Sequence, residues 1–256
     1  MSNPSQKSKG KYIFATAEQS YEDYSSGRVL YGASGATNFP VRLSSEIFQR
    51  CKSYLSEGDK EQSYVIWDAF CGVAYSMTVL GLLHNPKIQH IYASDADESI
   101  LETAKKNLYL LKKAGLNQRV DELEGLVEKF NKQSHKDALV SANNLKQRIG
   151  GHIDTDVFQF NVLTDPKPLG MKGVDIMIVD LPYGQLTDWN GLEVEQEPTQ
   201  IFLNNIKTSL NPRAIIAIVS DKKQKIYHDG YSKLKSFNLG KRKIWFFEYL
   251  RNKSSD

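Results

Sequence analysis

Five short apolar runs are spread along the chain, and each ends in a polar or acidic residue. The runs are residues 64–67, 88–94, 156–160, 174–179 and 213–219, and the residues that follow them are Asp68, Asp95, Asn161, Asp180 and Ser220. The run 174–179 is the most uniform, because its side chains are largely β-branched and none is polar after Asp175. Short continuous runs of this kind are typical of strands that are buried on both faces of a parallel sheet.

Segments with helical periodicity lie between these runs. Ser44 or Ser45 is expected to begin a helix that continues to about Leu55, and Asp97 is a good N-cap for a helix over residues 98–111. Two further helices are predicted, one after Ala74 and one over residues 198–210 that ends before Asn211-Pro212. Strands that alternate with helices through short connections indicate a doubly wound α/β fold.

Two parts of the chain depart from the alternation of strands and helices. Residues 231–239 and 243–250 read as a closing antiparallel hairpin around Gly240-Lys241-Arg242, which brings the predicted sheet to seven strands. Residues 112–152 contain two charged amphipathic segments, 118–130 and 135–149, where a short loop is expected. The predicted fold is therefore Rossmann-like, with a mostly parallel seven-stranded sheet, a C-terminal antiparallel hairpin and a helical insertion.

The rest of the chain fits one domain. Residues 1–11 are polar and rich in Lys and Ser, so we expect a disordered tail without a signal peptide. Residues 12–256 are expected to form a single domain, in which residues 12–60 are an N-terminal extension and residues 28–31 a short strand.

Composition places the chain among soluble proteins. Hydrophobic residues make up 40% and charged residues 25% of the sequence, and no apolar run reaches the roughly 18 residues of a membrane span. Two cysteines, Cys51 and Cys71, without a secretory signal are best interpreted as reduced thiols in a cytoplasm. The five histidines lack cysteine or carboxylate partners at ligand spacing, so no metal site is expected.

Charge is distributed unevenly along the chain. Residues 222–256 hold ten Lys or Arg and three Asp or Glu, whereas the rest of the chain has a net charge of −4. Such asymmetry fits a surface that meets a polyanion, although a solvated basic face is an equal alternative.

A ligand-binding turn is predicted after the first strand. Asp68 precedes Gly72 by four residues, and glycine there lets the backbone approach a ligand at a helix N-terminus. The second glycine that an NAD pyrophosphate needs is replaced by Ala74, which disfavours an NAD-dependent oxidoreductase. A donor with only a carboxylate and a sulfonium, S-adenosylmethionine, asks less of this loop. Asp95 stands where an acid accepts both ribose hydroxyls, and Asn161 is placed for an adenine edge.

The segment Asp180-Leu181-Pro182-Tyr183 decides the class of chemistry. Its acid, proline and aromatic ring after the fourth strand resemble the D/N/S-P-P-Y/F motif of methyltransferases that act on amino or ring nitrogens. An aromatic ring is a stacking platform for an unpaired base. Asp180 and the Leu181 carbonyl are acceptors that hold a base N–H, and Asp180 is placed to take a proton from a ring nitrogen. The alternative is a turn in which proline and glycine are only structural.

Five segments together resemble one family, the avilamycin-resistance guanine methyltransferases that act on 23S ribosomal RNA. They are residues 38–50, 68–75, 78–84, 93–97 and 179–184, and the resemblance extends from about Arg28 to the last strand. It implies S-adenosylmethionine as cofactor and methylation of a guanine nitrogen in the large-subunit RNA. It leaves open which guanine is modified, whether at N1 or N2, and whether for antibiotic resistance or ribosome maturation.

The resemblance also assigns residues to roles. The cofactor would be lined by Asp68, Phe70, Gly72, Ala74, Asp95, Ala96, Asn161 and Asp180, and the target base by residues 180–183. The family has glycine where this chain has Ala74, whose methyl group either narrows the methionine pocket or is accommodated. The candidate RNA contacts are Arg28, Arg42, Trp189, Lys222, Lys223, Lys225, Lys241, Arg242 and Lys243.

Two other functions are compatible with the same sequence. One is a methyltransferase for another nucleic acid, and the other is a nucleic-acid-binding protein that kept this fold and lost catalysis. Only Ala74 supports the second alternative, and binding of the cofactor or of its demethylated product distinguishes them.

Overall fold

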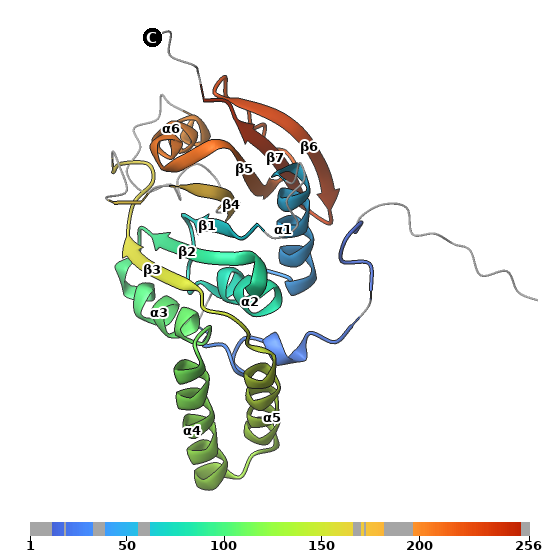
Figure 1. Cartoon of the computed structure of the whole chain (residues 1–256), viewed down its shortest axis with the longest axis vertical. Coiled ribbons are helices and arrows are strands. Elements are labelled where there is room, and N and C mark those ends of the chain that lie inside the picture. Colours follow the sequence, from blue (N-terminus) through green and yellow to red (C-terminus); the bar gives the residue numbers. More distant parts are fainter. Residues whose placement is uncertain are drawn as a thin grey trace, which may run out of the picture.

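The computed structural model describes residues 12–17, 19–32, 39–55, 62–165, 170–171, 173–181 and 197–251. Its centre is a twisted sheet with helices on both faces, from which a pair of helices projects (Figure 1). The predicted tail 1–11 and the candidate residues Pro182, Tyr183 and Trp189 lie outside the described residues. No helix in the described part of the chain combines the length and the apolar character that crossing a bilayer requires.

The sheet has seven strands in the order β3-β2-β1-β4-β5-β7-β6. The strands are β1 (Tyr64–Asp68), β2 (Ile88–Asp95), β3 (Asp154–Gln159), β4 (Val174–Asp180), β5 (Leu210–Asp221), β6 (Tyr231–Leu239) and β7 (Arg242–Tyr249). Strands β3, β2, β1, β4 and β5 pair in parallel, and β7 pairs antiparallel with both β5 and β6. The predicted Rossmann-like sheet with an antiparallel C-terminal hairpin is thereby confirmed.

Alternating side chains of the strands enter two hydrophobic cores, one on each face of the sheet. Ile176 and Ile178 of β4 face the core under α1 (Val41–Leu55), α2 (Tyr75–His84) and α3 (Leu101–Tyr109). Met177 and Val179 face the smaller core under α6 (Pro198–Asn205). Burial on both faces explains why this strand is apolar at every position after Asp175.

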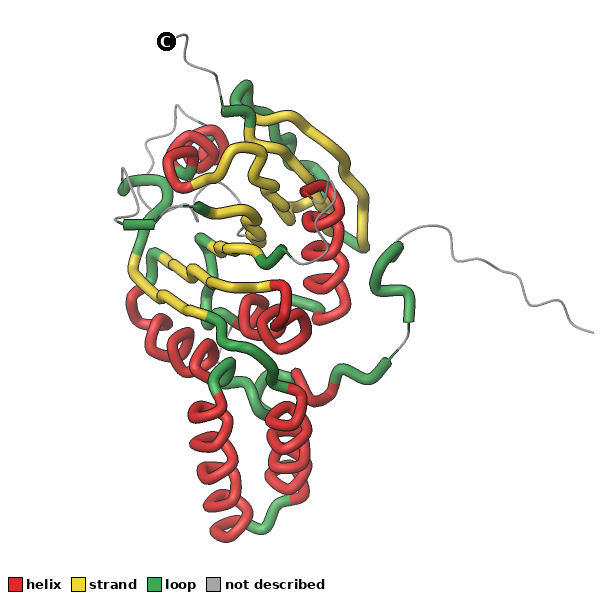
Figure 2. The backbone as a smooth tube through the Cα atoms, in the orientation of Figure 1, coloured by secondary structure: helices red, strands yellow, loops and turns green. Residues whose placement is uncertain are grey.

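The helical insertion is confirmed and forms a hairpin that extends away from the sheet (Figure 2). It consists of α4 (Lys113–Phe130) and α5 (Gln133–Arg148). The first helix begins at Lys113 rather than at the predicted Gln118, because Leu116 and Gly115 are already buried at its base. Arg119 of α4 donates to the carbonyls of Val29 at 2.9 Å and Arg28 at 3.2 Å, so the hairpin base is tied to the N-terminal extension.

Several predicted boundaries are wrong. Helix α1 begins at Val41, because the Pro40 carbonyl accepts the N–H groups of Leu43 and Ser44 at 2.9 and 3.0 Å. Ser44 and Ser45 are therefore buried within the helix and do not cap it. The expected strand at residues 28–31 is only an isolated bridge between Ser26 and Leu30.

The turn expected at Asn211-Pro212 is instead part of β5. Helix α6 ends at Asn205, a short 3-10 turn follows at Lys207–Ser209, and β5 begins at Leu210. The pairing of β4 with β5 is irregular over this stretch, since Val174 pairs with Leu210 and Ile176 with Ile215. The Asn211 side chain fills the irregularity by donating to the Gly173 carbonyl at 3.0 Å and to Asp175 at 2.7 Å.

Candidate active site at the carboxyl edge of the sheet

Three carboxylates end neighbouring parallel strands. Asp68 ends β1 beside Ala93 of β2, Asp95 ends β2 beside Gln159 of β3, and Asp180 ends β4 beside Val219 of β5. All parallel strands run the same way, so the three acids gather at one edge of the sheet. Ligands bind at this edge in open α/β sheets, and the structure brings the predicted acids together there.

Asp68 is the most buried of the three, with 7% of its surface exposed. Its Oδ1 accepts the N–H of Phe70 at 3.0 Å, and the Phe70 ring packs edge-on against Phe202 of α6. Burial, with a smaller contribution from the nearby charges of Asp95 and Asp180, raises the pKa of Asp68 to about 8, although the Phe70 N–H bond lowers it. Asp68 is therefore predominantly protonated at neutral pH, which lets three acids share the edge.

The loop between β1 and α2 has two residues in the left-handed region. Gly72 has φ +54° and a Cβ added there would meet no atom within 4 Å, so its backbone borders open space. Its N–H donates to Asp95 Oδ2 at 2.9 Å. Ala74 has φ +55° at the N-cap of α2, a conformation that costs a residue with a side chain about 1–2 kcal/mol. The Ala74 methyl group is fully buried in the larger core.

Asp95 organises the same loop from the second strand. Besides the Gly72 N–H, its carboxylate accepts the N–H of Asp97 at 3.1 Å. The residue is only half-buried, and a carboxylate has about four acceptor positions, so it retains capacity for a diol. The carbonyl of Ala96 accepts from Gln159 at 3.1 Å. Asp97 caps the following 3-10 turn through the N–H of Ser99 at 2.9 Å, as its sequence position predicts.

Asn161 follows β3 at the same edge and forms a local turn. Its Oδ1 accepts the N–H of Leu163 at 3.0 Å, and its own N–H donates to Asp165 at 2.8 Å. The preceding residue, Phe160, donates its N–H to the Asp95 carbonyl at 3.0 Å, so the turn is fixed beside the end of β2.

A buried asparagine that the sequence analysis missed supports the Gly72 loop from behind. Asn107 of α3 is fully buried, and its Nδ2 donates to the carbonyls of Val73 at 2.8 Å and Tyr31 at 2.9 Å. Its Oδ1 accepts the N–H of Tyr31 at 2.8 Å. The signal in the sequence is a polar residue on the otherwise apolar face of the helix, with Leu101, Ala104 and Leu108.

The transfer segment is described only at its start. The N–H of Leu181 donates to the Val219 carbonyl at 2.9 Å, and the Leu181 side chain is 1% exposed. This contact continues the pairing of β4 with β5 past Asp180. Asp180 is half-buried, so its carboxylate lies at the boundary between the core and the edge of the sheet.

The two N-terminal arginine candidates contact the protein itself. Arg28 pairs with Glu22 at 3.3 Å and with Asp137 of α5 at 3.9 Å. Arg42 donates to the carbonyls of Ala15 at 2.8 Å and Thr16 at 3.1 Å. Both guanidinium groups thus hold the N-terminal extension.

The C-terminal basic candidates are placed nearer the acids. In the register of β5 with β7, Asp221 faces Arg242 and Ser220 faces Lys243, so the β6–β7 turn reaches the same edge as Asp180. Lys222 and Lys223 directly follow β5, Lys241 lies in the turn, and Lys225 is in the connection to β6. The Arg242 guanidinium lies 5.3 Å from the Phe39 ring centre, and the Lys243 ammonium 3.7 Å from that of Trp245.

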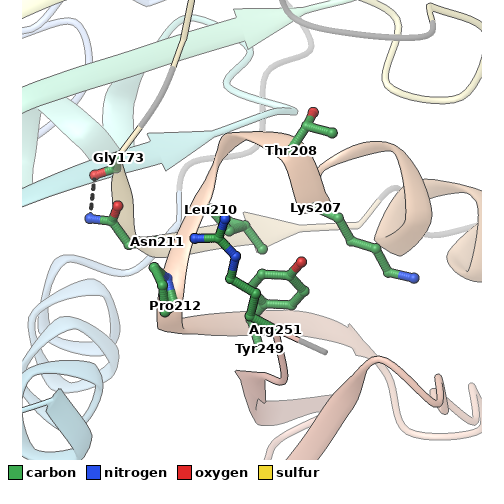
Figure 3. Close-up of a pocket in the computed structure, with 8 residues that line it drawn as sticks. All are labelled: Gly173, Lys207, Thr208, Leu210, Asn211, Pro212, Tyr249 and Arg251. Carbon is green, nitrogen blue, oxygen red and sulfur yellow. Dashed lines mark hydrogen bonds between the residues drawn. The ribbon is translucent and has the colours of Figure 1, made fainter. Parts of the chain in front are cut away.

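One pocket of about 420 Å³ lies at the opposite edge of the sheet (Figure 3). It is lined by residues where β4 and β5 begin and where β7 ends, namely Gly173, Lys207, Thr208, Leu210, Asn211, Pro212, Tyr249 and Arg251. It contains none of the predicted site residues. The described residues also hold no group of three His, Cys, Asp or Glu side chains that fits a metal ion.

Comparisons with known proteins agree with this arrangement. A sequence model of the family described as "RRNA methyltransferase AviRa" matches residues 10–242. A 23S rRNA (guanine(2535)-N(1))-methyltransferase from Streptomyces viridochromogenes is 37% identical over 238 residues, which is 90% of this chain and 93% of the relative. Two solved structures of rRNA methyltransferase aviRa from the same organism match with TM-scores of 0.81 and identities of 35% and 34%, covering 93% of this chain and 96% of theirs.

Proposed function

We propose that this chain, which belongs to the rRNA methyltransferase AviRa family, methylates a guanine of 23S ribosomal RNA at the ring nitrogen N1. The family makes the chain an rRNA methyltransferase. Two observations support methylation of 23S RNA at N1. Gly72, Asp95 and Asp180 lie at one edge of the sheet. A relative is named for methylation of a guanine at N1.

We propose S-adenosylmethionine as the methyl donor. Each part of this molecule has a candidate binding residue at the carboxyl edge of the sheet. Asp95 retains acceptor capacity for the ribose hydroxyls, and Asn161 lies beside it for the adenine. The open space at Gly72, in front of the N-terminus of α2, suits the methionine carboxylate. A cationic sulfonium is favoured beside the carboxylate of Asp180, while the protonated Asp68 adds no opposing charge. Phe70, Ala74 and Ala96 contribute the backbone that connects these groups.

Methylation of guanine at N1 requires that the N1 proton be removed. In this proposal Asp180 accepts the N1 proton of guanine, while the Leu181 carbonyl, next in the chain, accepts a hydrogen bond from an N–H of the same base. S-adenosylmethionine held by these residues would supply the methyl group to the nitrogen lone pair, and the bonding electrons would stay on its sulfur as a neutral thioether. Tyr183 completes this proposal as the predicted stacking platform, and Pro182 belongs to the same predicted transfer segment.

The test uses 23S RNA from an unmodified source, both naked and in large subunits, with radiolabelled S-adenosylmethionine. We expect label in one guanine, and mass analysis of the nucleoside assigns N1. Asp180→Asn should lower kcat about 10²–10⁴-fold with little change in affinity for S-adenosylhomocysteine, which has no sulfonium charge, whereas Asp95→Asn should mainly weaken binding of both the cofactor and this product. Asp156→Asn, an exposed acid on β3, is the matched control.

Two results would contradict this function. Absence of label from both forms of the substrate excludes 23S RNA, and label in another nucleic acid redirects the enzyme to that substrate. Failure to bind S-adenosylhomocysteine in calorimetry favours a nucleic-acid-binding protein that lost catalysis.

A further inference from the structure

Tyr227 is the most exposed large hydrophobic side chain in the described part of the protein. It is 68% exposed, although its neighbours Ile226 and His228 are 5% and 6% exposed. The two buried neighbours fix the backbone on either side of the ring, while the ring itself stays in solvent. Its faces are therefore accessible to a partner that stacks on an aromatic side chain.

Residues 226–230, which carry Tyr227, are held by side-chain hydrogen bonds. His228 Nδ1 accepts the N–H of Gly230 at 2.9 Å, so Nε2 carries the proton and donates to Asn204 of α6 at 3.0 Å. The Tyr227 carbonyl accepts from Gln200 of α6, and the Tyr227 hydroxyl donates to Asp229. Both ends of the residue are held, and the two faces of the ring stay available.

The connection that contains Tyr227 starts at the same edge of the sheet as the candidate active site. Residues 222–230 connect the end of β5 at the carboxyl edge with the start of β6 at the opposite edge. On the way they pass α6, and Gln200 belongs to the first turn of that helix. Tyr227 therefore lies on a path that begins beside Asp180 and runs along α6.

The charges along this path are cationic. Lys222, Lys223 and Lys225 are exposed, and none forms an ion pair with the residues that the structure describes. Two acids lie on the same path. Asp221, at the end of β5, accepts the N–H of Lys223 at 2.8 Å, and Asp229 accepts a hydrogen bond from the Tyr227 hydroxyl. Lysines that precede an exposed aromatic ring match single-stranded nucleic acid, whose phosphates bind cations and whose bases stack on rings.

We propose that Tyr227 stacks on an unpaired base that flanks the target guanine, while Lys222, Lys223 and Lys225 contact the adjoining phosphates. This inference rests on the proposed function for its partner, 23S RNA. A protein partner is disfavoured, because three lysines near the ring, none ion-paired with a residue that the structure describes, are costly to desolvate in a protein interface.

The test compares RNA affinity for matched variants of the full chain, measured by filter binding to an unmodified 23S RNA fragment at several salt concentrations. Tyr227→Ala should weaken binding about tenfold or more, with the loss of one base–aromatic stack. Tyr227→Phe keeps the ring and should bind within about twofold of the wild type. The triple variant K222A/K223A/K225A should lower the salt slope by about 2, whereas Tyr227→Ala should leave that slope unchanged.

Two controls separate this inference from a folding defect and from the proposed function. Tyr109→Ala removes another exposed ring, 40% exposed at the end of α3, and should leave RNA affinity unchanged. Affinity for S-adenosylhomocysteine should be the same in every variant. Wild-type RNA affinity in Tyr227→Ala, or an equal loss in Tyr227→Phe, overturns the stacking role even when the wild type methylates RNA. An inactive wild type contradicts the proposed function, and the affinities still decide the role of Tyr227.

Discussion

Asp68 shows how burial of one residue makes the stability of the whole fold depend on pH. Its pKa is raised from the ordinary 3.8 to about 8 in the folded chain, first by burial and then by Asp95 and Asp180. Between these two values the folded state binds more protons than the unfolded state. The contribution of Asp68 to the free energy of unfolding therefore falls as pH rises from about 4 to about 8, and levels off above that range.

We predict that Asp68→Asn removes this slope. The amide keeps its oxygen for the Phe70 N–H but has no proton to lose, so the decline between pH 5 and pH 8 should shrink by on the order of 3 kcal/mol. Urea unfolding at four pH values measures it. Asp121→Asn, at an exposed position of α4, should keep the wild-type slope. A pH profile of Asp68→Asn that follows the wild type would show that another group titrates.

At the residue scale, the sequence predicted the acids at the strand ends, but it did not predict the buried polar side chains that hold the neighbouring loops. Asp68, Asp95 and Asp180 could be found because each ends an apolar run, and strand ends meet at one edge. The left-handed conformation of Ala74 was not predicted, although glycine, which this φ favours, is the residue that the family pattern has there. Asn107 was not predicted, because its partner Tyr31 is 76 residues away and no local pattern joins the two.

At the element scale, two glycines of α4 are a matched pair. A Cβ on Gly115 would stand 2.0 Å from the carbonyl oxygen of Tyr109, whereas a Cβ on Gly125 would meet nothing within 4 Å. The Tyr109 carbonyl is backbone at the end of α3, so it cannot yield without moving the hairpin base.

We therefore predict opposite effects of the same substitution in one helix. Gly115→Ala should lower the free energy of unfolding by about 2–3 kcal/mol through overpacking, and Gly125→Ala should raise it by up to about 1 kcal/mol through helix propensity. Chemical denaturation followed by circular dichroism measures both. Similar changes in the two variants would mean that α3 and α4 do not meet closely at Gly115.

Elements were predicted where hydrophobic periodicity is strong, and their ends were not. The helices over 98–111 and 118–130 were found, but the chain forms a 3-10 turn at Glu98–Ile100 before α3 and starts α4 at Lys113. Asn211-Pro212 has the composition of a turn, yet it lies in β5 because the Asn211 side chain bonds across the irregular pairing with β4. Local propensity cannot anticipate such a tertiary bond.

At the scale of the whole molecule, the order of the sheet follows from alternation of strands and helices with right-handed crossovers. The course of the N-terminal extension does not. It is held by side chains distant in sequence, namely Glu46, Asn107, Arg119 and Glu122. Bonds between side chains and an irregular backbone leave no periodicity, so residues 12–32 could be described beforehand only as an extension.

Glu46 is the strongest of these ties. It is fully buried, and its carboxylate accepts the N–H groups of Ile13, Phe14 and Ala15 at 2.8, 2.9 and 2.8 Å. It also pairs with Arg50, which is 2% exposed, at 2.8 Å. The Arg50 guanidinium lies 4.1 Å from the ring centre of Phe237 in β6. One carboxylate thus joins the N-terminal extension to α1 and, through Arg50, to the last hairpin of the sheet.

We predict that Glu46→Gln lowers the free energy of unfolding by about 3–5 kcal/mol, because it breaks the buried ion pair with Arg50 and turns an amide donor toward backbone N–H groups. Limited proteolysis should then cut within residues 12–32 faster than in the wild type. Glu102→Gln is the control, since it breaks an exposed pair with Lys105 and should change neither measurement. If cleavage of the extension is unchanged in Glu46→Gln while stability falls, Glu46 acts only through Arg50, and the extension is held by Asn107 and Arg119.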